Sequence, residues 1–304
     1  MNTITIGTRG SKLALWQAEE VARSIRTVSP DYNIKIEIIR TEGDRDQHSS
    51  LTKIGGQGIF TKQIEESLLL KKIDIAVHSL KDLPSVMPDD LTLSAVLKRG
   101  DVRDILISKA GYTWNNLPLN AKIGSGSIRR RALLKSVRPD INCHDLRGNI
   151  ETRLKKLDTE NLDAIIMAKA AIERLEIKHV NYTELDEKIF IPAVGQGTVG
   201  LQIRKDSEDL NKLLEKINHK DTFCCVQSER AFLRELDSGC QYPLGAYATI
   251  IDHQVYISGF VSNFNGQKII RENSITEKKN YINAGTDLAR KLIKLGALDL
   301  LNDE

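Results

Sequence analysis

The stretch DIAVHSLKDLP, Asp74 to Pro84, decides the fold of this chain. An apolar run from Ile73 to Val77 has the length and the β-branched residues of a buried strand, and Pro84 breaks the chain soon after it. The polar residues in between are His78, Ser79, Lys81 and Asp82. In open α/β sheets, ligands bind outside the carboxyl ends of the strands, so Lys81 and Asp82 are expected to face a substrate. A surface salt bridge between these two residues is the alternative.

Length and composition describe an ordinary globular protein. The chain has 304 residues, of which 40% are hydrophobic and 28% charged, enough to bury a sizeable core in two or three domains. Its formal net charge of +3 is too small to indicate a nucleic-acid partner, so an anionic ligand has to meet a local basic cluster. No apolar run reaches about 18 residues, so a membrane is not an expected partner either. The first residues, MNTITIGTRG, lack the basic and apolar regions of a signal peptide, and we expect a cytoplasmic protein.

The four cysteines are Cys143, Cys224, Cys225 and Cys240. No CxxC pair or other metal-ligand spacing joins them, which argues against a disulfide framework and against a zinc site. Cys143 lies within a strand pattern, and Cys224 and Cys225 lie within a helix pattern, so packing is expected for all three. Cys240 follows Gly239 in an expected loop, where a thiol is accessible. It is the candidate functional cysteine, with simple packing as the alternative.

The first segment predicts a strand and a helix joined by an anion-binding turn. Thr3 to Gly7 has a strand pattern, and Ser11 is a candidate N-cap of the helix that follows. Arg9 and the backbone N–H groups of the first helical turn then lie together, an arrangement suited to a carboxylate or phosphate. Another strand and helix pattern leads to the Ile73 strand and completes a βαβαβ unit. The polar, glycine-rich stretch Thr41 to Gly58 could cover a site.

After Gly100 the same pattern begins again. A strand pattern ends in GSGSIRRRA, in which Ser127 precedes a helix that opens with three arginines, residues 129 to 131. Cations at a helix N-terminus oppose the macrodipole, and an anionic ligand would offset that cost. A solvated basic face is the alternative, since three consecutive helical residues cannot all point one way. The glycines do not make a dinucleotide fingerprint, because Arg129 stands where the third glycine belongs.

Further basic residues follow two more strand patterns. Arg147 follows one of them, and Arg153 lies on the next helix. Arg174 lies on the helix after the other. Glycine-marked connections near Arg99 and Gly195 then indicate two similar lobes joined by two crossings, with a ligand cleft between them.

From about Lys220 the pattern changes to that of a small α+β domain. A helix pattern is followed by alternating strands, an Asn265-Gly266 hairpin signal and a closing amphipathic helix. The sequence therefore predicts an α/β fold with two βα lobes and a ligand cleft, plus a small α+β C-terminal domain. The expected divisions are residues 1–98 with 198–218 for domain 1, 99–197 for domain 2, and 219–304 for domain 3.

Seven segments carry a specific family resemblance: GTRGSKLALWQA, KIGGQGIFTKQIE, DIAVHSLKDLP, GSGSIRRRA, LRGNIETRL, IPAVGQG and SGCQYPLGAYA. In this order, and over nearly the whole chain, the sequence resembles the hydroxymethylbilane synthase family, also called porphobilinogen deaminases. The resemblance implies three domains, of which two are lobes like periplasmic binding proteins and the third carries a cysteine on a loop. It also implies a monomeric transferase of porphyrin and heme biosynthesis.

The reaction that this resemblance implies condenses four porphobilinogen molecules head-to-tail into a linear tetrapyrrole, hydroxymethylbilane, with loss of ammonia. It also implies a dipyrromethane cofactor that is joined to Cys240 by a thioether and serves as the primer. Asp82 matches the family's catalytic aspartate, which orients the pyrrole nitrogens and stabilises developing positive charge. Each substrate brings an acetate and a propionate, which explains the demand for fixed cations. The matched residues for cofactor and substrate binding are Arg9, Ser11, Lys53, Lys81, Ser127, Arg129, Arg130, Arg147, Arg153 and Arg174.

Four positions depart from the family pattern. Gln57 stands where many members have lysine, Gly10 where glutamine or glutamate is usual, Ser238 where glycine is usual, and Glu176 where glycine often follows the arginine helix. None of them replaces Asp82 or Cys240. The alternative function is that of a two-lobed cytoplasmic anion-binding protein without covalent chemistry. Such a protein would bind anions reversibly and would have no use for the SGCQYPLG loop.

Overall fold

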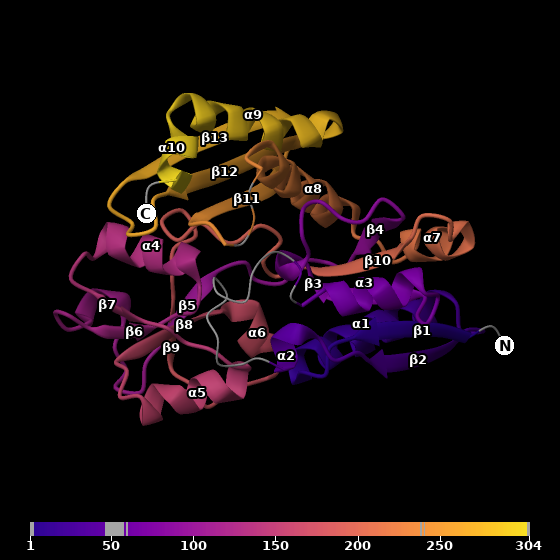
Figure 1. Cartoon of the computed structure of the whole chain (residues 1–304), viewed down its shortest axis with the longest axis horizontal. Helices are drawn as coiled ribbons and strands as arrows, with labels where there is room; N and C mark the ends of the chain where they lie inside the picture. The colour runs from indigo at the N-terminus through magenta and orange to yellow at the C-terminus, as the bar shows by residue number, and fades with distance from the viewer. Residues whose placement is uncertain (1–2, 46–57, 59, 238, 240, 303–304) are drawn as a thin grey trace. The chain divides into compact units, whose positions relative to one another are not determined.

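The computed structural model describes residues 3–45, 58, 60–237, 239 and 241–302. The chain divides into two compact units, one formed by Met1–Gly100 with Gly197–Cys224 and the other by Asp101–Gln196 with Cys225–Glu304. Within the described residues the first unit contains a five-stranded sheet, and the second contains a five-stranded and a three-stranded sheet (Figure 1). We call the five-stranded sheets with their helices lobe 1 and lobe 2. The predicted fold class, two βα lobes and a small α+β C-terminal part, is confirmed.

Lobe 1 is built on a mostly parallel sheet. Its elements in chain order are β1 (Thr3–Thr8), α1 (Lys12–Val28), β2 (Asn33–Ile38), α2 (Glu42–Arg45), α3 (Lys62–Leu69), β3 (Ile75–Ser79), the 3-10 turn η1 (Leu80–Asp82), β4 (Leu91–Val96), β10 (Val199–Arg204) and α7 (Glu208–Glu215). The strand order is β2-β1-β3-β10-β4. Strand β1 pairs in parallel with β2 and β3, and β10 is antiparallel to β3 and β4. The expected βαβαβ unit is therefore present.

Helices cover both faces of this sheet because alternate strand residues point to opposite sides. Ile75 and Val77 of β3 enter the hydrophobic cluster that holds the apolar face of α1. Ala76 points the other way and packs with Leu68 of α3. The apolar stripe of α1 and the alternation of residues along β3 thus produce two hydrophobic layers, one on each face of the sheet.

Strand β3 begins and ends two residues later than its apolar run predicts. The run predicts an end at Val77, but pairing with β10 continues through His78 and Ser79. His78 is buried, and its Nε2 lies 3.0 Å from Oε1 of Gln202 on β10. Nε2 of Gln202 in turn donates to Oε1 of Glu65 at 2.8 Å. A polar residue can therefore extend a buried strand when the neighbouring strand supplies its hydrogen-bond partner.

Lobe 2 repeats the topology of lobe 1. In chain order its elements are β5 (Asp104–Ile107), the 3-10 turn η2 (Trp114–Asn116), β6 (Lys122–Gly124), α4 (Ile128–Val137), β7 (Asn142–His144), α5 (Ile150–Thr159), β8 (Ala164–Ala168), α6 (Lys169–Arg174) and β9 (Tyr182–Glu184). The strand order is β7-β6-β8-β5-β9. Strand β6 pairs in parallel with β7 and β8, and β5 is antiparallel to β8 and β9. The two similar lobes that the repeated sequence pattern predicts are therefore present.

Each of the two crossing segments leads into the antiparallel strand of its lobe. Strand β5 follows the crossing near Gly100, and β10 follows the crossing near Gly197. Because an antiparallel strand starts where its parallel neighbours end, Asp104 and Val199 lie at the carboxyl edges of their sheets. The backbone N–H of Gly100 donates to the carbonyl oxygen of Gly197 at 3.0 Å. Each crossing therefore enters its lobe at the edge where open α/β sheets bind ligands.

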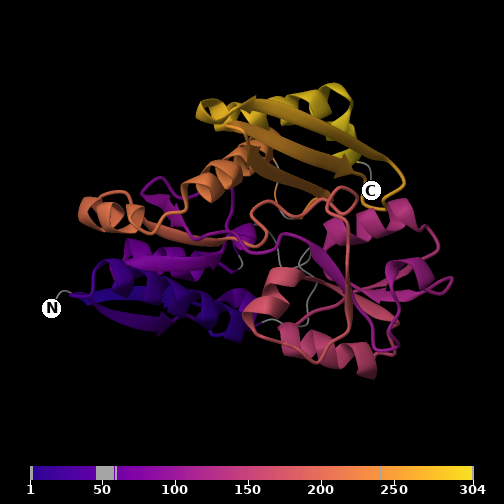
Figure 2. The ribbon, with the colours of Figure 1, turned by 180° about the vertical axis from the view of Figure 1, so that it is seen from behind.

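The third sheet is an antiparallel meander with helices on one face (Figure 2). Its elements are α8 (Lys220–Glu235), which begins in the first unit and continues in the second, β11 (Leu244–Ile251), β12 (Gln254–Ser262), β13 (Ile269–Glu277), the 3-10 turn η3 (Lys278–Asn280), α9 (Tyr281–Lys294) and α10 (Ala297–Asn302). The predicted hairpin at Asn265-Gly266 joins β12 to β13. Gly266 has a φ of +75°, and a Cβ there would clash with the carbonyl oxygen of Ala132 in α4.

The third sheet and lobe 2 share a core. Val255 and Ile257 of β12 pack with Leu288 and Leu292 of α9, whereas Phe260 joins the hydrophobic cluster of lobe 2. This packing explains why both belong to one compact unit. The finer division into three domains stays a prediction. In the part of the chain that the structure describes, no helix is both long and apolar enough to cross a membrane.

Candidate functional site

Four of the predicted site residues lie at the carboxyl edge of lobe 1. Arg9 directly follows β1, and Ser11 directly precedes α1. Lys81 and Asp82 lie in the 3-10 turn that follows β3. Because β1 and β3 are adjacent parallel strands, their carboxyl ends bring the four residues to one edge of the sheet.

Local contacts hold the side chains of Arg9 and Ser11. The guanidinium carbon of Arg9 lies 4.1 Å from the centre of the Phe60 ring, a cation–π contact. Oγ of Ser11 accepts a hydrogen bond from the backbone N–H of Ala14 at 3.3 Å, so Ser11 is the predicted N-cap of α1. Phe60 is not a predicted site residue. The signal in the sequence that points to Phe60 is an aromatic residue just after the glycine-rich stretch.

The carboxylate of Asp82 is half-buried on a closed turn. The backbone N–H of Leu83 donates to the carbonyl oxygen of Leu80 at 3.1 Å and closes this turn. The end of β3 is anchored to α1, because Nε2 of Gln17 donates to Oγ of Ser79 at 2.9 Å. Among the described residues, none makes a hydrogen bond or ion pair with the Asp82 carboxylate. A fixed backbone with an unengaged carboxylate suits an acceptor for the N–H groups of a ligand.

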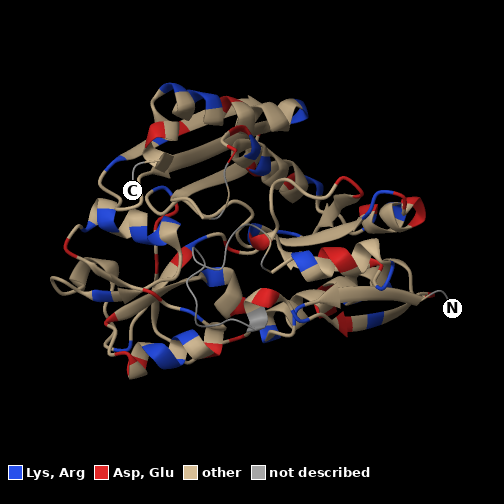
Figure 3. Ribbon diagram, viewed as in Figure 1, with Lys and Arg blue, Asp and Glu red and all other residues tan. Residues whose placement is uncertain are grey.

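Most of the predicted cations belong to the carboxyl edge of lobe 2. Ser127 caps α4 just after β6, and its Oγ accepts from the backbone N–H of Arg130 at 3.4 Å. Arg147 follows β7, Arg153 lies on α5, and Arg174 ends α6. Strands β6, β7 and β8 are parallel neighbours, so the segments that carry these residues leave one edge of the sheet. Figure 3 marks Lys and Arg in blue at several positions along α4 and α5.

Arg147 and Arg153 are oriented by the turn between β7 and α5. The side chain of Arg147 is 15% exposed, and its Nε lies 3.5 Å from Oδ2 of Asp145. Arg153 donates through Nε to the carbonyl oxygen of Gly148 at 2.8 Å. Gly148 has a φ of +108°, a backbone conformation that favours glycine. The turn thus places Arg147 beside Asp145 and ties Arg153 to the backbone of Gly148.

Arg129 and Arg130 are buried against Asp104 at the start of α4. Nη2 of Arg129 donates to Oδ2 of Asp104 at 2.6 Å. Nε and Nη2 of Arg130 donate to Oδ1 of Asp104 at 3.1 and 2.8 Å. The alternative of a solvated basic face is therefore wrong for these two arginines, whereas Arg131 is half-buried. Contact of Arg129 and Arg130 with a ligand stays a prediction.

Asp104 is not among the predicted site residues. It is the first residue of an apolar strand and directly follows a crossing segment. A carboxylate is rarely buried without a cationic partner, so an aspartate at that position is the signal that would have found it. Burial alone would raise the pKa of Asp104, but the charges and hydrogen bonds of Arg129 and Arg130 hold it well below its usual range.

Lys169 follows β8 at the same edge but is already paired. Its Nζ lies 2.8 Å from Oδ2 of Asp101 and 2.5 Å from Oε1 of Glu184. Arg103 forms ion pairs with the same two carboxylates. Hydrogen bonds from Arg103 and Lys169 hold the pKa of Asp101 well below its usual range, against the opposing effect of burial. This network gives lobe 2 a pH-dependent part of its stability.

We expect Asp101→Asn to destabilise the protein at pH 7 but much less at low pH. The folded-state pKa of Asp101 lies below its unfolded value of about 3.9, so its ionised form stabilises the fold above that pH. This contribution is lost as the pH falls towards the folded-state pKa. Urea unfolding of both proteins between about pH 3 and pH 7 measures the difference. A difference in unfolding free energy that stays constant over this range would contradict the assignment.

The remaining predicted site residues lie outside the described residues. They are Lys53 and Cys240. The departures Gln57 and Ser238 and most of the glycine-rich stretch lie outside the described residues too. Two other cysteines are described in detail. Cys143 is half-buried in β7, and burial raises the pKa of its thiol. Cys225 packs in the core of the third sheet. Neither thiol is in a setting that favours a reactive thiolate.

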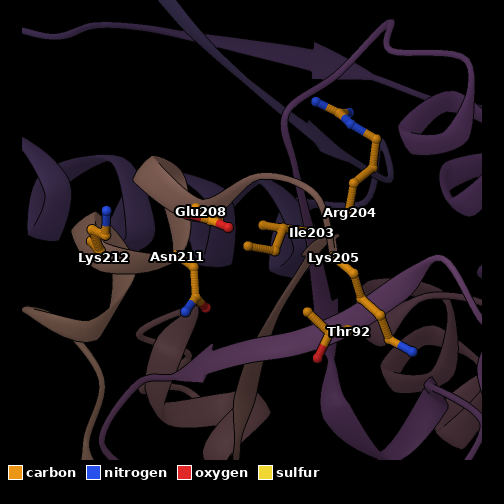
Figure 4. A pocket seen from close by; sticks show the side chains of 7 residues that line it. All are labelled: Thr92, Ile203, Arg204, Lys205, Glu208, Asn211 and Lys212. Carbon is orange, nitrogen blue, oxygen red and sulfur yellow. The ribbon is translucent and has the colours of Figure 1, made fainter.

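A pocket of about 370 Å³ opens at the opposite edge of lobe 1 (Figure 4). Its lining residues are Thr92, Ile203, Arg204, Lys205, Glu208, Asn211 and Lys212. Arg204 ends β10, and because β10 is antiparallel, that end lies at the amino edge of the parallel strands. Arg204 also donates to the carbonyl oxygens of Leu68 and Ile73 at 2.8 and 2.9 Å. The pocket is therefore not part of the predicted site.

Two family models match this chain. "Porphobilinogen deaminase, dipyromethane cofactor binding domain" matches residues 4–212, and "Porphobilinogen deaminase, C-terminal domain" matches residues 223–294. A porphobilinogen deaminase from Syntrophomonas wolfei is 43% identical over 99% of this chain and 98% of that protein. Another from Chlorobium phaeovibrioides is 41% identical over 99% of this chain and 97% of that protein. A solved periplasmic binding protein from Salmonella typhimurium with high arginine specificity shares 14% identity at a TM-score of 0.41, covering 73% of this chain and 94% of that chain. Since the family matches extend over almost its entire length, the chain belongs to the porphobilinogen deaminase family.

Proposed function

We propose that the protein is a hydroxymethylbilane synthase, a transferase of porphyrin and heme biosynthesis. It joins four porphobilinogen molecules head-to-tail into a linear tetrapyrrole and releases ammonia at each condensation. The observation that carries this proposal is the placement of Asp82. An unengaged, half-buried carboxylate follows β3 at the carboxyl edge of lobe 1, the edge that also carries Arg9 and Lys81. Membership of the family supports the same conclusion.

The donor set of lobe 2 fits a dipyrromethane cofactor, which carries two carboxylates on each ring. Arg129 and Arg130 share the carboxylate of Asp104, and Arg147 pairs with Asp145. Guanidinium groups bind carboxylates through charge-assisted hydrogen bonds, so a ligand with several carboxylates can meet several of these arginines. The residues that would hold the cofactor and the growing chain are Arg9, Ser11, Lys53, Lys81, Ser127, Arg129, Arg130, Arg147, Arg153 and Arg174, with a thioether to Cys240. When bound, the cofactor supplies the free pyrrole α-carbon to which the first substrate unit is joined.

The arginines and lysines bind and orient the rings. A guanidinium group matches a carboxylate in a bidentate contact, and its planar fork fixes the direction of the ring that carries the carboxylate. Lysine supplies a point charge without that directional constraint. Holding a ring by its acetate and propionate keeps its nitrogen and reacting carbon in place, which lowers the entropic cost of the condensation.

Asp82 interacts with the pyrrole nitrogens and with the positive charge that develops during the reaction. Its carboxylate accepts hydrogen bonds from pyrrole N–H groups. As ammonia leaves the aminomethyl group of the substrate, positive charge spreads over the ring, and the fixed negative charge of Asp82 stabilises it. A carboxylate at this position can also act as a base. It then accepts the proton that the attacking α-carbon loses when the ring becomes aromatic again.

Incubation of the purified protein with porphobilinogen tests this function. We expect one ammonia for each substrate molecule consumed and one linear tetrapyrrole for every four. A two-lobed anion-binding protein would instead bind porphobilinogen reversibly and release no ammonia. Binding without ammonia release would overturn the proposal in favour of that alternative.

The cellular location and the assembly state belong to the same proposal. We place the protein in the cytoplasm as a monomer with three domains, on the basis of its family resemblance. Light scattering coupled to size-exclusion chromatography measures the assembly state directly.

A further inference from the structure

One buried carboxylate organises two of the cations proposed to bind the cofactor. Asp104 is fully buried and accepts hydrogen bonds from Arg129, Arg130 and Gln196. Arg129 contacts Oδ2, whereas Arg130 and Gln196 contact Oδ1. Each oxygen of the carboxylate therefore fixes one guanidinium group. The division between the two oxygens sets the spacing of the two arginines.

Backbone carbonyl groups complete the orientation of both guanidinium groups. Nη1 of Arg129 donates to the carbonyl oxygen of Ile191 at 2.7 Å, and Nη1 of Arg130 donates to that of Ile166 at 3.1 Å. Arg130 thus uses Nε, Nη1 and Nη2 in three hydrogen bonds, two of them to Asp104. Among the described residues, its other two N–H groups have no acceptor. Those N–H groups are available to a ligand carboxylate.

The cluster lies in a poorly solvated place. The side chains of Arg129 and Arg130 are 5% and 6% exposed, and that of Asp104 is 0% exposed. Two buried guanidinium groups share one buried carboxylate, so their hydrogen bonds to Asp104 are formed away from water.

Gln196 connects this cluster to a crossing segment. It lies in the IPAVGQG motif, to which the proposed mechanism assigns no role. Its Nε2 donates to Oδ1 of Asp104 at 2.9 Å and to the carbonyl oxygen of Val102 at 2.7 Å. Val102 and Asp104 belong to the other crossing, where the chain enters β5 at the carboxyl edge of lobe 2. The amide of Gln196 therefore fixes the position of the Asp104 carboxylate.

We infer that Asp104 is a positioning residue for the proposed reaction. It holds Arg129 and Arg130 at the spacing and angle in which they take a carboxylate of the pyrrole chain, and Gln196 fixes Asp104. This inference rests on the proposed function, because it assumes that the two arginines bind cofactor or substrate. Asp104 touches neither, and acts through the arginines.

The variant Asp104→Glu tests the inference with the charge of the cluster unchanged. The longer side chain moves the carboxylate by about one bond length and displaces both guanidinium groups, a misplacement that costs on the order of tenfold or more in function. We expect the folded variant to carry less cofactor per molecule in its intact mass, and to show a KM for porphobilinogen raised about tenfold. A purely structural ion pair would lower the thermal midpoint and the folded fraction but leave the KM and the loading of folded molecules unchanged.

Asp140→Glu is the matched control. Asp140 lies in the same lobe and accepts hydrogen bonds from Nε and Nη2 of Arg138 at 2.7 and 2.6 Å, without contacting a predicted site residue. We expect wild-type loading and KM for this variant. Wild-type loading and KM for folded Asp104→Glu as well would overturn the inference.

A second variant decides the question if Asp104→Glu does not fold. Gln196→Met keeps the volume and the charge but removes both Nε2 hydrogen bonds. Loss of a hydrogen bond to a charged group loosens Asp104, and we expect a KM raised about threefold or more. An unchanged KM would again overturn the inference. A wild-type protein with neither cofactor mass nor turnover would instead overturn the proposed function itself, and this inference with it.

Discussion

Asp82→Asn is expected to fold normally and to lose most of its turnover. The side chains of aspartate and asparagine have nearly the same shape, and the turn that carries Asp82 is closed by backbone groups alone. The amide lacks the negative charge that stabilises the developing cation. Loss of one such electrostatic group costs about 3 kcal/mol, or a factor on the order of 100 in rate. Single-turnover kinetics with porphobilinogen measure this loss directly.

Asp89→Asn controls for the loss of a charge in the same lobe. Asp89 is exposed in the loop between η1 and β4, away from the strand ends that carry the predicted site. We expect its rate to match that of the wild type. Near-wild-type turnover of purified Asp82→Asn would contradict the role assigned to its charge.

Cys240→Ser is expected to abolish turnover altogether, the largest effect of any single change. The thioether needs a nucleophilic sulfur, and a serine hydroxyl is a far poorer nucleophile than a thiol at neutral pH. Without the attached primer, the first condensation has no acceptor carbon. Acidic Ehrlich reagent, which colours free pyrrole α-positions, should stain the wild type and leave Cys240→Ser colourless.

Cys143→Ser is the control that shows whether turnover also depends on a thiol at another position. Cys143 lies in lobe 2 on β7, and burial raises its thiol pKa, so it is not placed to react. We expect Cys143→Ser to keep both the colour reaction and the turnover. Full turnover of Cys240→Ser would show that the primer is attached elsewhere or not at all.

The sequence predicts the periodic elements of this fold well. The stripe from Ala14 to Ile25 is the buried face of α1, and the Asn265-Gly266 turn joins the expected pair of strands. These elements follow from local patterns of polarity and turn residues, which each segment carries by itself. Strand β9 has no such pattern, because its residues, Tyr182 to Glu184, are few and mostly polar. Helix α7 is also missing from the prediction, although Leu213 and Leu214 mark its buried face.

The candidate site also contains residues that local sequence patterns predict and a contact that they do not predict. Residues such as Arg9, Lys81 and Asp82 stand directly after strand patterns, so a rule about strand ends is enough to group them. Asp104 follows no parallel strand and starts an antiparallel one. Its place beside Arg129 depends on long-range pairing that no local pattern reports. For that reason the sequence signals the burial of Asp104 by its place at the start of an apolar strand, but the pairing of Asp104 with Arg129 and Arg130 could not be predicted.

The intact mass of the wild-type protein tests the central claim most directly. The protein should be purified from a host that makes porphobilinogen and measured without prior exposure to substrate. We predict a mass above that of the bare chain by two substrate units less the ammonia lost in condensation, mapped to the peptide that contains Cys240. A mass equal to that of the unmodified 304-residue chain would contradict covalent cofactor attachment and leave reversible anion binding as the better account.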